Sequence, residues 1–144
     1  MAEQTRTFIQ NLLMVQSSFR QAIQRNLKKN NIDLTFEMLQ IMVHLWKKDG
    51  INQQEIATKT FKDKASLTYL INNLTTRGLV FRQEDPIDRR NNNIYLTELG
   101  GEYGRKVKPM LQEIYKMASE KIDSSNFDVC INYLHDLDNA FKDI

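Results

Sequence analysis

The side chains most able to take part in chemistry in this chain are polar groups suited to binding, and they gather between positions 61 and 97. Residues 85–93 are DPIDRRNNN, which places Arg89 and Arg90 side by side on a polar segment after Asp88. Guanidinium groups on a projecting loop can clamp phosphate oxygens or enter a minor groove. We expect Asp88 to orient a neighbouring guanidinium. In isolation, such a hairpin is better explained as a solvated turn, so its neighbours decide the interpretation.

The segment before this loop predicts a helix with two unlike faces. At about 100° per residue, its apolar stripe consists of Leu67, Leu70, Ile71 and Leu74. The opposite face carries Ala65, Tyr69, Asn72 and Thr76, with Ser66, Thr68 and Asn73 on the flanks. A solvated helix face is usually rich in Glu and Lys, whereas hydroxyls, amides and a methyl group match base edges in the major groove. A plain surface helix rich in Asn and Thr is the alternative.

A short helix over 52–58, capped by Asn52, precedes this helix and completes a helix-turn-helix. Gln53, Gln54 and Ser66 lie near helix N-termini, where backbone and side-chain donors can hold phosphate oxygens. The two helices together favour contact with duplex DNA. In this context DNA contact is also the favoured role of Arg89 and Arg90.

The remaining elements follow from periodicity and capping residues. Apolar residues recur every three or four positions over 8–27, which predicts a long one-sided helix ending at Asn30. Thr35 can cap a second helix that is apolar nearly all round and should form the buried centre. A short strand is expected at Ile51, and strands over 79–81 and 94–96 should enclose a hairpin loop over 84–93. Thr97 then caps a long helix containing Pro109, and a last helix begins near residue 127.

Composition sets the class of protein. A chain of 144 residues can bury one core without metals or disulfides, and its net charge of +2 makes the location of basic residues more informative than their number. Cys130 is the only cysteine, and it is expected to be a buried hydrophobe rather than a redox sensor. No apolar segment approaches the roughly 20 residues that span a bilayer, so a cytoplasmic protein without membrane partners is expected.

Catalytic and cofactor sites are not expected. The chain has no phosphate-cradling glycine loop, no nucleophile–base pair and no cluster with metal-ligand spacing. His44 is interpreted as a hydrogen-bonded core residue, and His135 lacks a ligand-spaced partner. We therefore expect a non-enzyme that holds neither a metal nor a cofactor.

Four segments resemble the MarR family of regulators. DKASLT at 63–68 is similar to the opening of the family's recognition helix and RGLV at 77–80 to its exit, while DPIDRR at 85–90 resembles its wing signature and LTELG at 96–100 the motif that follows. The resemblance implies a homodimeric repressor of a pseudo-palindromic operator, often released by a small phenolic or lipophilic effector. The DNA-binding residues are then Gln53, Gln54, Lys64, Ala65, Ser66, Thr68, Tyr69, Asn72, Arg89 and Arg90. Tyr69 and Phe81 depart from the family, which often has a basic and a charged residue at these positions.

Both terminal helices have hydrophobic stripes suited to pairing with a second copy of the chain. Such pairing is expected because a protein that reads a palindromic DNA site needs two recognition helices about 34 Å apart. The expected interface residues are Phe8, Leu12, Phe127, Leu134, Leu137 and Phe141. Coverage of the chain's own domain is the alternative role of these helices. Aromatic and methionine residues such as Phe19, Trp46 and Met110 could line an effector pocket, although this pattern is more often plain core.

The predicted fold is mainly α with a small β-hairpin wing, as one domain over 1–144. Residues 34–100 form the winged helix-turn-helix lobe, and residues 1–33 and 101–144 form the helical dimerisation region. The favoured partners are double-stranded DNA and a second copy of the chain. The alternative function is a winged-helix module that binds protein without specific DNA recognition.

Overall fold

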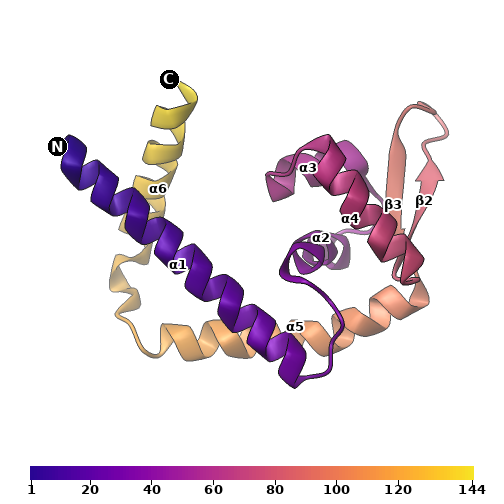
Figure 1. Cartoon of the computed structure of the whole chain (residues 1–144), viewed down its shortest axis with the longest axis horizontal. Coiled ribbons are helices and arrows are strands. Elements are labelled where there is room, and N and C mark those ends of the chain that lie inside the picture. Colours follow the sequence, from indigo (N-terminus) through magenta and orange to yellow (C-terminus); the bar gives the residue numbers. More distant parts are fainter. The chain divides into compact units, whose positions relative to one another are not determined.

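A computed structural model describes residues 1–144, and it confirms a mainly α-helical fold with a small antiparallel sheet (Figure 1). In chain order the elements are α1 (Ala2–Lys29), α2 (Phe36–Lys47), β1 (Ile51–Asn52), α3 (Gln53–Thr60), α4 (Lys64–Thr76), β2 (Val80–Glu84), β3 (Asn92–Leu96), α5 (Glu98–Ser119), a 3₁₀ helix (Ser124–Asn126) and α6 (Phe127–Lys142). They divide into two compact units, residues 1–110 and 111–144. No helix is both long enough and apolar enough to cross a bilayer.

Helix α2 supplies much of the core of the first unit, as its composition predicts. Its buried side chains are Phe36, Met38, Leu39, Ile41, Met42 and Leu45. Ile23 and Leu27 of α1, Leu67, Ile71 and Leu74 of α4, and Ile94 of β3 are buried with them. Each buried aliphatic side chain of this size contributes about 1.5–3 kcal/mol relative to exposure. Val43 is 39% exposed, so α2 retains one open edge.

Three predicted helix caps are present, because each depends only on residues one turn away. The Thr35 hydroxyl oxygen accepts a hydrogen bond from the Met38 amide at 3.1 Å. Asn52 Oδ1 accepts from the Gln54 amide, and Asp63 Oδ1 accepts from the Ser66 amide, both at 2.7 Å. These caps begin α2, α3 and α4, and they therefore set the start of both helices of the helix-turn-helix.

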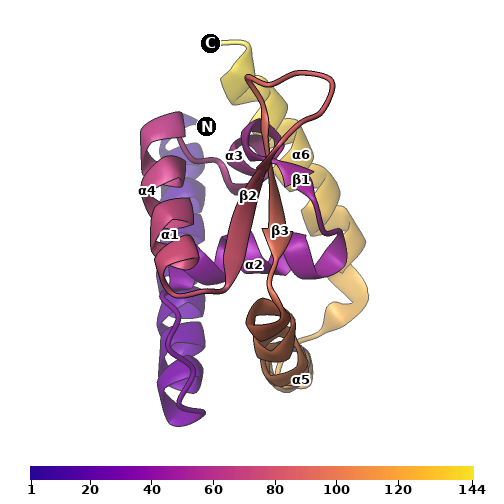
Figure 2. The same ribbon diagram turned by 90° about the vertical axis from the view of Figure 1, so that its right-hand side faces the viewer.

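The sheet has the strand order β1-β3-β2, with all pairs antiparallel (Figure 2). Its strands are longer than predicted, since β2 continues to Glu84 and β3 already begins at Asn92, which pairs with Glu84. Asparagine is a poor strand former, but pairing of the two backbones satisfies their hydrogen bonds and outweighs that preference. The hairpin loop is thereby shortened to residues 85–91. Phe81 stacks on Tyr95 across the pair, with ring centroids 5.5 Å apart.

The start of α5 is fixed against the beginning of the wing. The Thr97 hydroxyl donates to the Gly78 carbonyl at 2.6 Å and accepts from the Gly100 amide at 3.0 Å, so Thr97 caps α5 as predicted. Trp46 Nε1 donates to the Gly100 carbonyl at 2.9 Å. These bonds join α2, the wing and α5 at one point. Helix α5 continues through Pro109.

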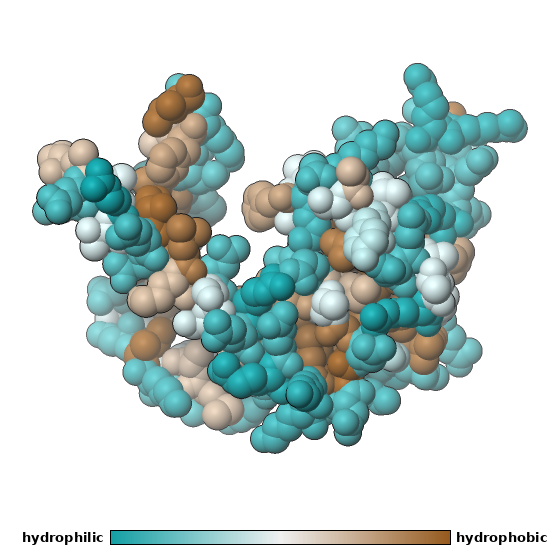
Figure 3. Space-filling model, in the orientation of Figure 1, coloured by the Kyte–Doolittle hydropathy of each residue, from teal (hydrophilic) through white to brown (hydrophobic).

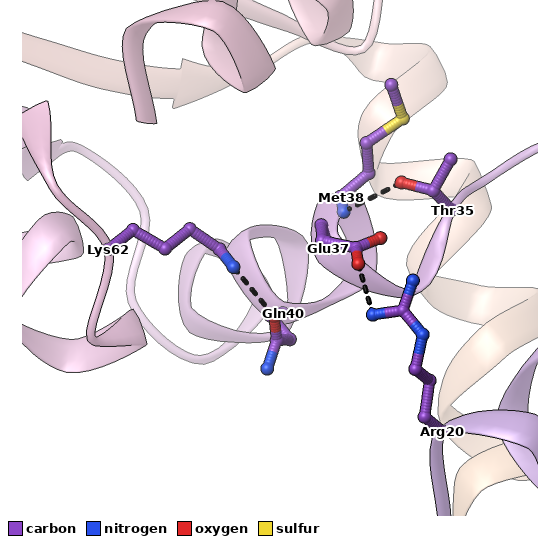
Figure 4. A network of polar contacts seen from close by, with 6 residues as sticks. All are labelled: Arg20, Thr35, Glu37, Met38, Gln40 and Lys62. Atoms are coloured by element: carbon purple, nitrogen blue, oxygen red, sulfur yellow. Dashed lines mark hydrogen bonds and ion pairs between the residues drawn. The ribbon is translucent and has the colours of Figure 1, made fainter. Parts of the chain in front are cut away.

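Polar contacts join α1 and the turn before α4 to α2 (Figure 4). Arg20 of α1 forms an ion pair with Glu37, and Lys62 Nζ donates to Gln40 Oε1 at 2.9 Å. Partial burial alone would raise the pKa of Glu37, but its own backbone amide and Arg20 hold that pKa below its usual value. Beyond the far end of α4, Arg77 pairs with Asp33 Oδ2 at 3.0 Å. Both ends of α4 are thus tied to the segment comprising α2 and the loop before it.

The second unit carries hydrophobic side chains on its surface. Helix α6 has no buried residue, and the C-terminal helix is visibly brown in Figure 3. Cys130 is exposed, so the prediction of a buried cysteine is wrong for the single chain. A helix buries a side chain only where another element covers it, and in the apolar stripe of α6 only Leu137 is half-buried while Phe127, Cys130, Leu134 and Phe141 are exposed.

Candidate nucleic-acid interface

Helix α4 presents the two faces that its periodicity predicts. Leu67, Ile71 and Leu74 are at most 1% exposed. The opposite face is open to solvent, and its exposed residues are Ala65, Tyr69, Asn72 and Thr76. Leu70 is only half-buried, which corrects its assignment to the core. It lies at the edge of the apolar stripe, beside the exposed Tyr69.

A concavity of about 590 Å³ lies between α3, α4 and the wing. We call it the α4–wing groove, and it is lined by Asn52, Gln53, Gln54, Ala57, Lys64, Leu67, Thr68, Asn72, Arg82, Arg90, Asn91 and Asn92. Three of these residues are cations and six are amides, while none is a carboxylate. Such a lining attracts anions and offers hydrogen-bond donors to their oxygens.

The groove gathers six of the predicted DNA-binding residues from three separate segments. They are Gln53, Gln54, Lys64, Thr68, Asn72 and Arg90. It adds four polar residues that the sequence analysis missed, namely Asn52, Arg82, Asn91 and Asn92. Arg82 shares the inward face of β2 with the buried Val80, because strand side chains alternate with a period of two. This alternation could have indicated from the sequence that Arg82 faces inward, but only if the strand were known to extend to Arg82.

The other predicted residues lie outside this groove. Ala65, Ser66 and Tyr69 line a more open concavity of about 620 Å³ on another side of α4, together with Phe61 and Lys62. The Ser66 hydroxyl donates to Asp63 Oδ2 at 3.0 Å, so it takes part in the helix cap. Hydrogen bonds from the Ser66 amide and hydroxyl lower the pKa of Asp63, which keeps this carboxylate ionised at the helix N-terminus. Arg89 is exposed on the wing and lines neither concavity.

Asp88 and Asp85 shape the tip of the wing. Asp88 Oδ1 accepts from the Arg90 amide at 3.1 Å and from Arg90 Nε at 3.4 Å. Asp85 Oδ1 accepts from the Ile87 amide at 2.9 Å, and backbone bonds of 3.0 Å link Asn91 to Asp85 and Asp88. The loop is thus closed by its own hydrogen bonds. Both arginines are exposed, but only Arg90 lines the groove.

Gln53 connects three elements inside the groove. Its Nε2 donates to Thr68 Oγ1 on α4 at 3.0 Å, and its Oε1 accepts from Arg82 Nε on β2 at 3.4 Å. The Thr68 hydroxyl in turn donates to the Lys64 carbonyl at 2.8 Å. Side chains from α3, α4 and the wing are therefore linked in one chain of hydrogen bonds (Figure 2 shows the three elements together).

Comparisons with known proteins agree with this architecture. A MarR family model matches residues 32–91. The transcriptional regulator SarZ of Staphylococcus haemolyticus is 32% identical over 99 residues, which are 69% of this chain and 63% of SarZ. The regulator TtmR of Methylorubrum extorquens is 34% identical over 68 residues, which are 47% of this chain and 35% of TtmR. The matches therefore span between about a third and just under two thirds of these relatives.

Among solved structures, the S. aureus MepR–DNA complex superposes on this chain with a TM-score of 0.82. The superposition covers 92% of this chain and 97% of MepR at 20% sequence identity, so it is a likeness of fold. The chain belongs to the MarR family and has a winged helix-turn-helix fold.

Proposed function

We propose that this protein is a homodimeric transcriptional regulator that binds double-stranded DNA in a sequence-specific manner. The observation that carries the proposal is the α4–wing groove, where three cations and six amides meet without a carboxylate. A duplex presents two kinds of group that suit this surface, namely phosphate oxygens for the cations and base edges for the amides. The exposed face of α4 beside the groove adds Tyr69 and Thr76, which are polar and uncharged.

The relatives support the same proposal. SarZ and TtmR are named as HTH-type transcriptional regulators, and MepR has been solved on DNA. We further propose, from the family resemblance, that the bound protein represses transcription and that a small phenolic or lipophilic ligand releases it.

Dimerisation is supported by hydrophobic side chains that one chain leaves uncovered. On α6, Phe127, Leu134 and Phe141 are 39–53% exposed. Large apolar surfaces of this kind are typical of subunit interfaces. Sedimentation equilibrium should therefore give twice the chain mass of 17.0 kDa at micromolar concentration, and a strictly monomeric protein would remove the dimer from the proposal.

DNA binding is tested by selecting bound fragments from genomic DNA and measuring affinity for the selected duplex against salt concentration. Replacing both Arg89 and Arg90 with alanine should abolish specific binding. If all four arginines of a dimer contact phosphates, the slope of log K against log salt for the remaining binding should become less negative by about 3.6, at about 0.9 per contact. The Arg6→Ala/Arg25→Ala variant removes the same charge from α1 and should bind as the wild type does.

Two results would contradict this proposal. Unchanged binding by the Arg89→Ala/Arg90→Ala variant would exclude the wing from DNA recognition. Weak retention of every duplex by the wild-type protein, without sequence preference, would instead favour a winged-helix module that binds another protein.

A further inference from the structure

Arg82 is a half-buried cation without a carboxylate partner. It lies in the middle of β2, where it pairs with Ile94 of β3, and its side chain is half-buried in the α4–wing groove. Arg77 and Arg90 each have a carboxylate partner, but Arg82 has none within 4.0 Å. Its side chain makes one hydrogen bond, from Nε to Gln53 Oε1. Four of the five guanidinium N–H donors are therefore free to bind an anion.

A partly buried guanidinium without a counter-charge is costly to desolvate, and an anion entering the groove would relieve that cost. The other cations of the lining, Lys64 and Arg90, lie on α4 and on the wing tip. Arg82 is anchored on the wing strand itself, so it is held by sheet pairing rather than by a loop.

Gln53 is placed to control the direction of this guanidinium. Its amide oxygen faces Arg82 and its amide nitrogen faces Thr68, so both ends of the side chain are engaged within the protein. Gln54, the next residue, lines the same groove, but its side chain makes no hydrogen bond to Arg82 or Thr68. The two glutamines therefore differ in role although they share a type and a location.

We propose that Arg82 binds a backbone phosphate of the duplex and that Gln53 is its positioning residue, which also couples the wing strand to the recognition helix through Thr68. This inference rests on the proposed function. It assigns Gln53 an action through Arg82, in place of the direct phosphate contact expected from its position at a helix N-terminus.

The test measures binding of a selected duplex by Arg82→Ala, Gln53→Ala and the double variant. A lost phosphate contact should lower the salt slope by about 0.9 per protomer, or about 1.8 for a dimer. Because Gln53 acts through Arg82, the loss of affinity in the double variant should be smaller than the product of the losses in the two single variants. The double variant should bind at least about threefold more tightly than that product predicts. Gln54→Ala is the matched control, and its effect should multiply with that of Arg82→Ala.

Arg82→Lys guards against a variant that only fails to fold. It keeps the charge but lacks Nε–H, so the salt slope should be retained while the coupling to Gln53 is lost. An Arg82→Ala variant that binds as the wild type, or that loses affinity with an unchanged salt slope, would overturn the inference while leaving the proposed function intact. Coupling as strong for Gln54 as for Gln53 would also overturn it. A wild-type protein that binds no duplex would overturn both.

Discussion

Two adjacent glycines in the first turn of α5 should respond to alanine in opposite directions. A Cβ atom on Gly100 would lie 2.2 Å from the Leu79 carbonyl oxygen, a distance that real Cβ atoms essentially never show, and 3.2 Å from its carbon. The nearest atom to a Cβ on Gly101 is the end of the Arg105 side chain, at 4.0 Å. The same substitution is therefore a collision at one position and harmless at the next.

The magnitudes follow from what surrounds each site. The Leu79 carbonyl accepts the Thr97 amide at 3.1 Å, so it can retreat from an alanine only by stretching that bond. Overpacking costs about 1–3 kcal/mol, and the strained hydrogen bond adds about 1 kcal/mol. Gly100→Ala should therefore destabilise the protein by about 2–4 kcal/mol. Gly101→Ala should stabilise it by about 0.5–1 kcal/mol, since alanine is the better helix former.

Thermal unfolding followed by circular dichroism decides between these expectations. The melting temperature should fall markedly for Gly100→Ala and rise by a few degrees for Gly101→Ala, at about 2–4 °C per kcal/mol for a chain of this size. Protein concentration must be equal in all samples because self-association shifts the midpoint. A shift in the same direction for both variants would refute the argument that the Leu79 carbonyl requires glycine at position 100.

Two further predictions concern a titrating side chain and a strained one. Burial, followed by the charges of Lys59 and Lys47, lowers the pKa of His44 below its ordinary 6.5, so the unfolded chain takes up this proton first as the pH falls. The free energy of unfolding should decline as the pH falls from about 6.5 to the pKa of His44 in the folded protein. His44→Gln should remove that part of the decline. A difference in unfolding free energy between variant and wild type that does not change with pH, measured by urea titration, would contradict this prediction. Phe61 has a left-handed φ of 56° and is 95% exposed, so Phe61→Gly should raise the free energy of unfolding by up to about 1 kcal/mol. A lowered melting temperature would show that the phenyl ring makes a stabilising contact that outweighs the strain.

Local features of the fold were accessible from the sequence. The caps at Thr35, Asn52 and Asp63 involve partners two or three residues away, and the apolar stripe of α4 follows from helical periodicity alone. The family motifs added the order of helix-turn-helix and wing.

Predictions from the sequence are wrong where a residue's environment depends on distant parts of the chain. Cys130 was expected to be buried because it lies in an apolar stripe, but a stripe does not say what covers it. The wing strands were predicted too short, because the pairing of Glu84 with Asn92 is invisible to residue preferences. Arg82 was missed for the same reason, since it belongs to the added part of β2.

Capping residues and periodicity are enough to locate the starts of α2, α3 and α4 and the polar face of α4, because these properties arise from neighbours within one turn. Which polar residues share one surface depends instead on contacts between distant segments. Gln53, Thr68 and Arg82 are linked through side-chain hydrogen bonds although 15 and 29 residues separate Gln53 from its two partners. The packing of α3 on α4 and the pairing of β2 with β3 create that proximity, and no local pattern encodes it.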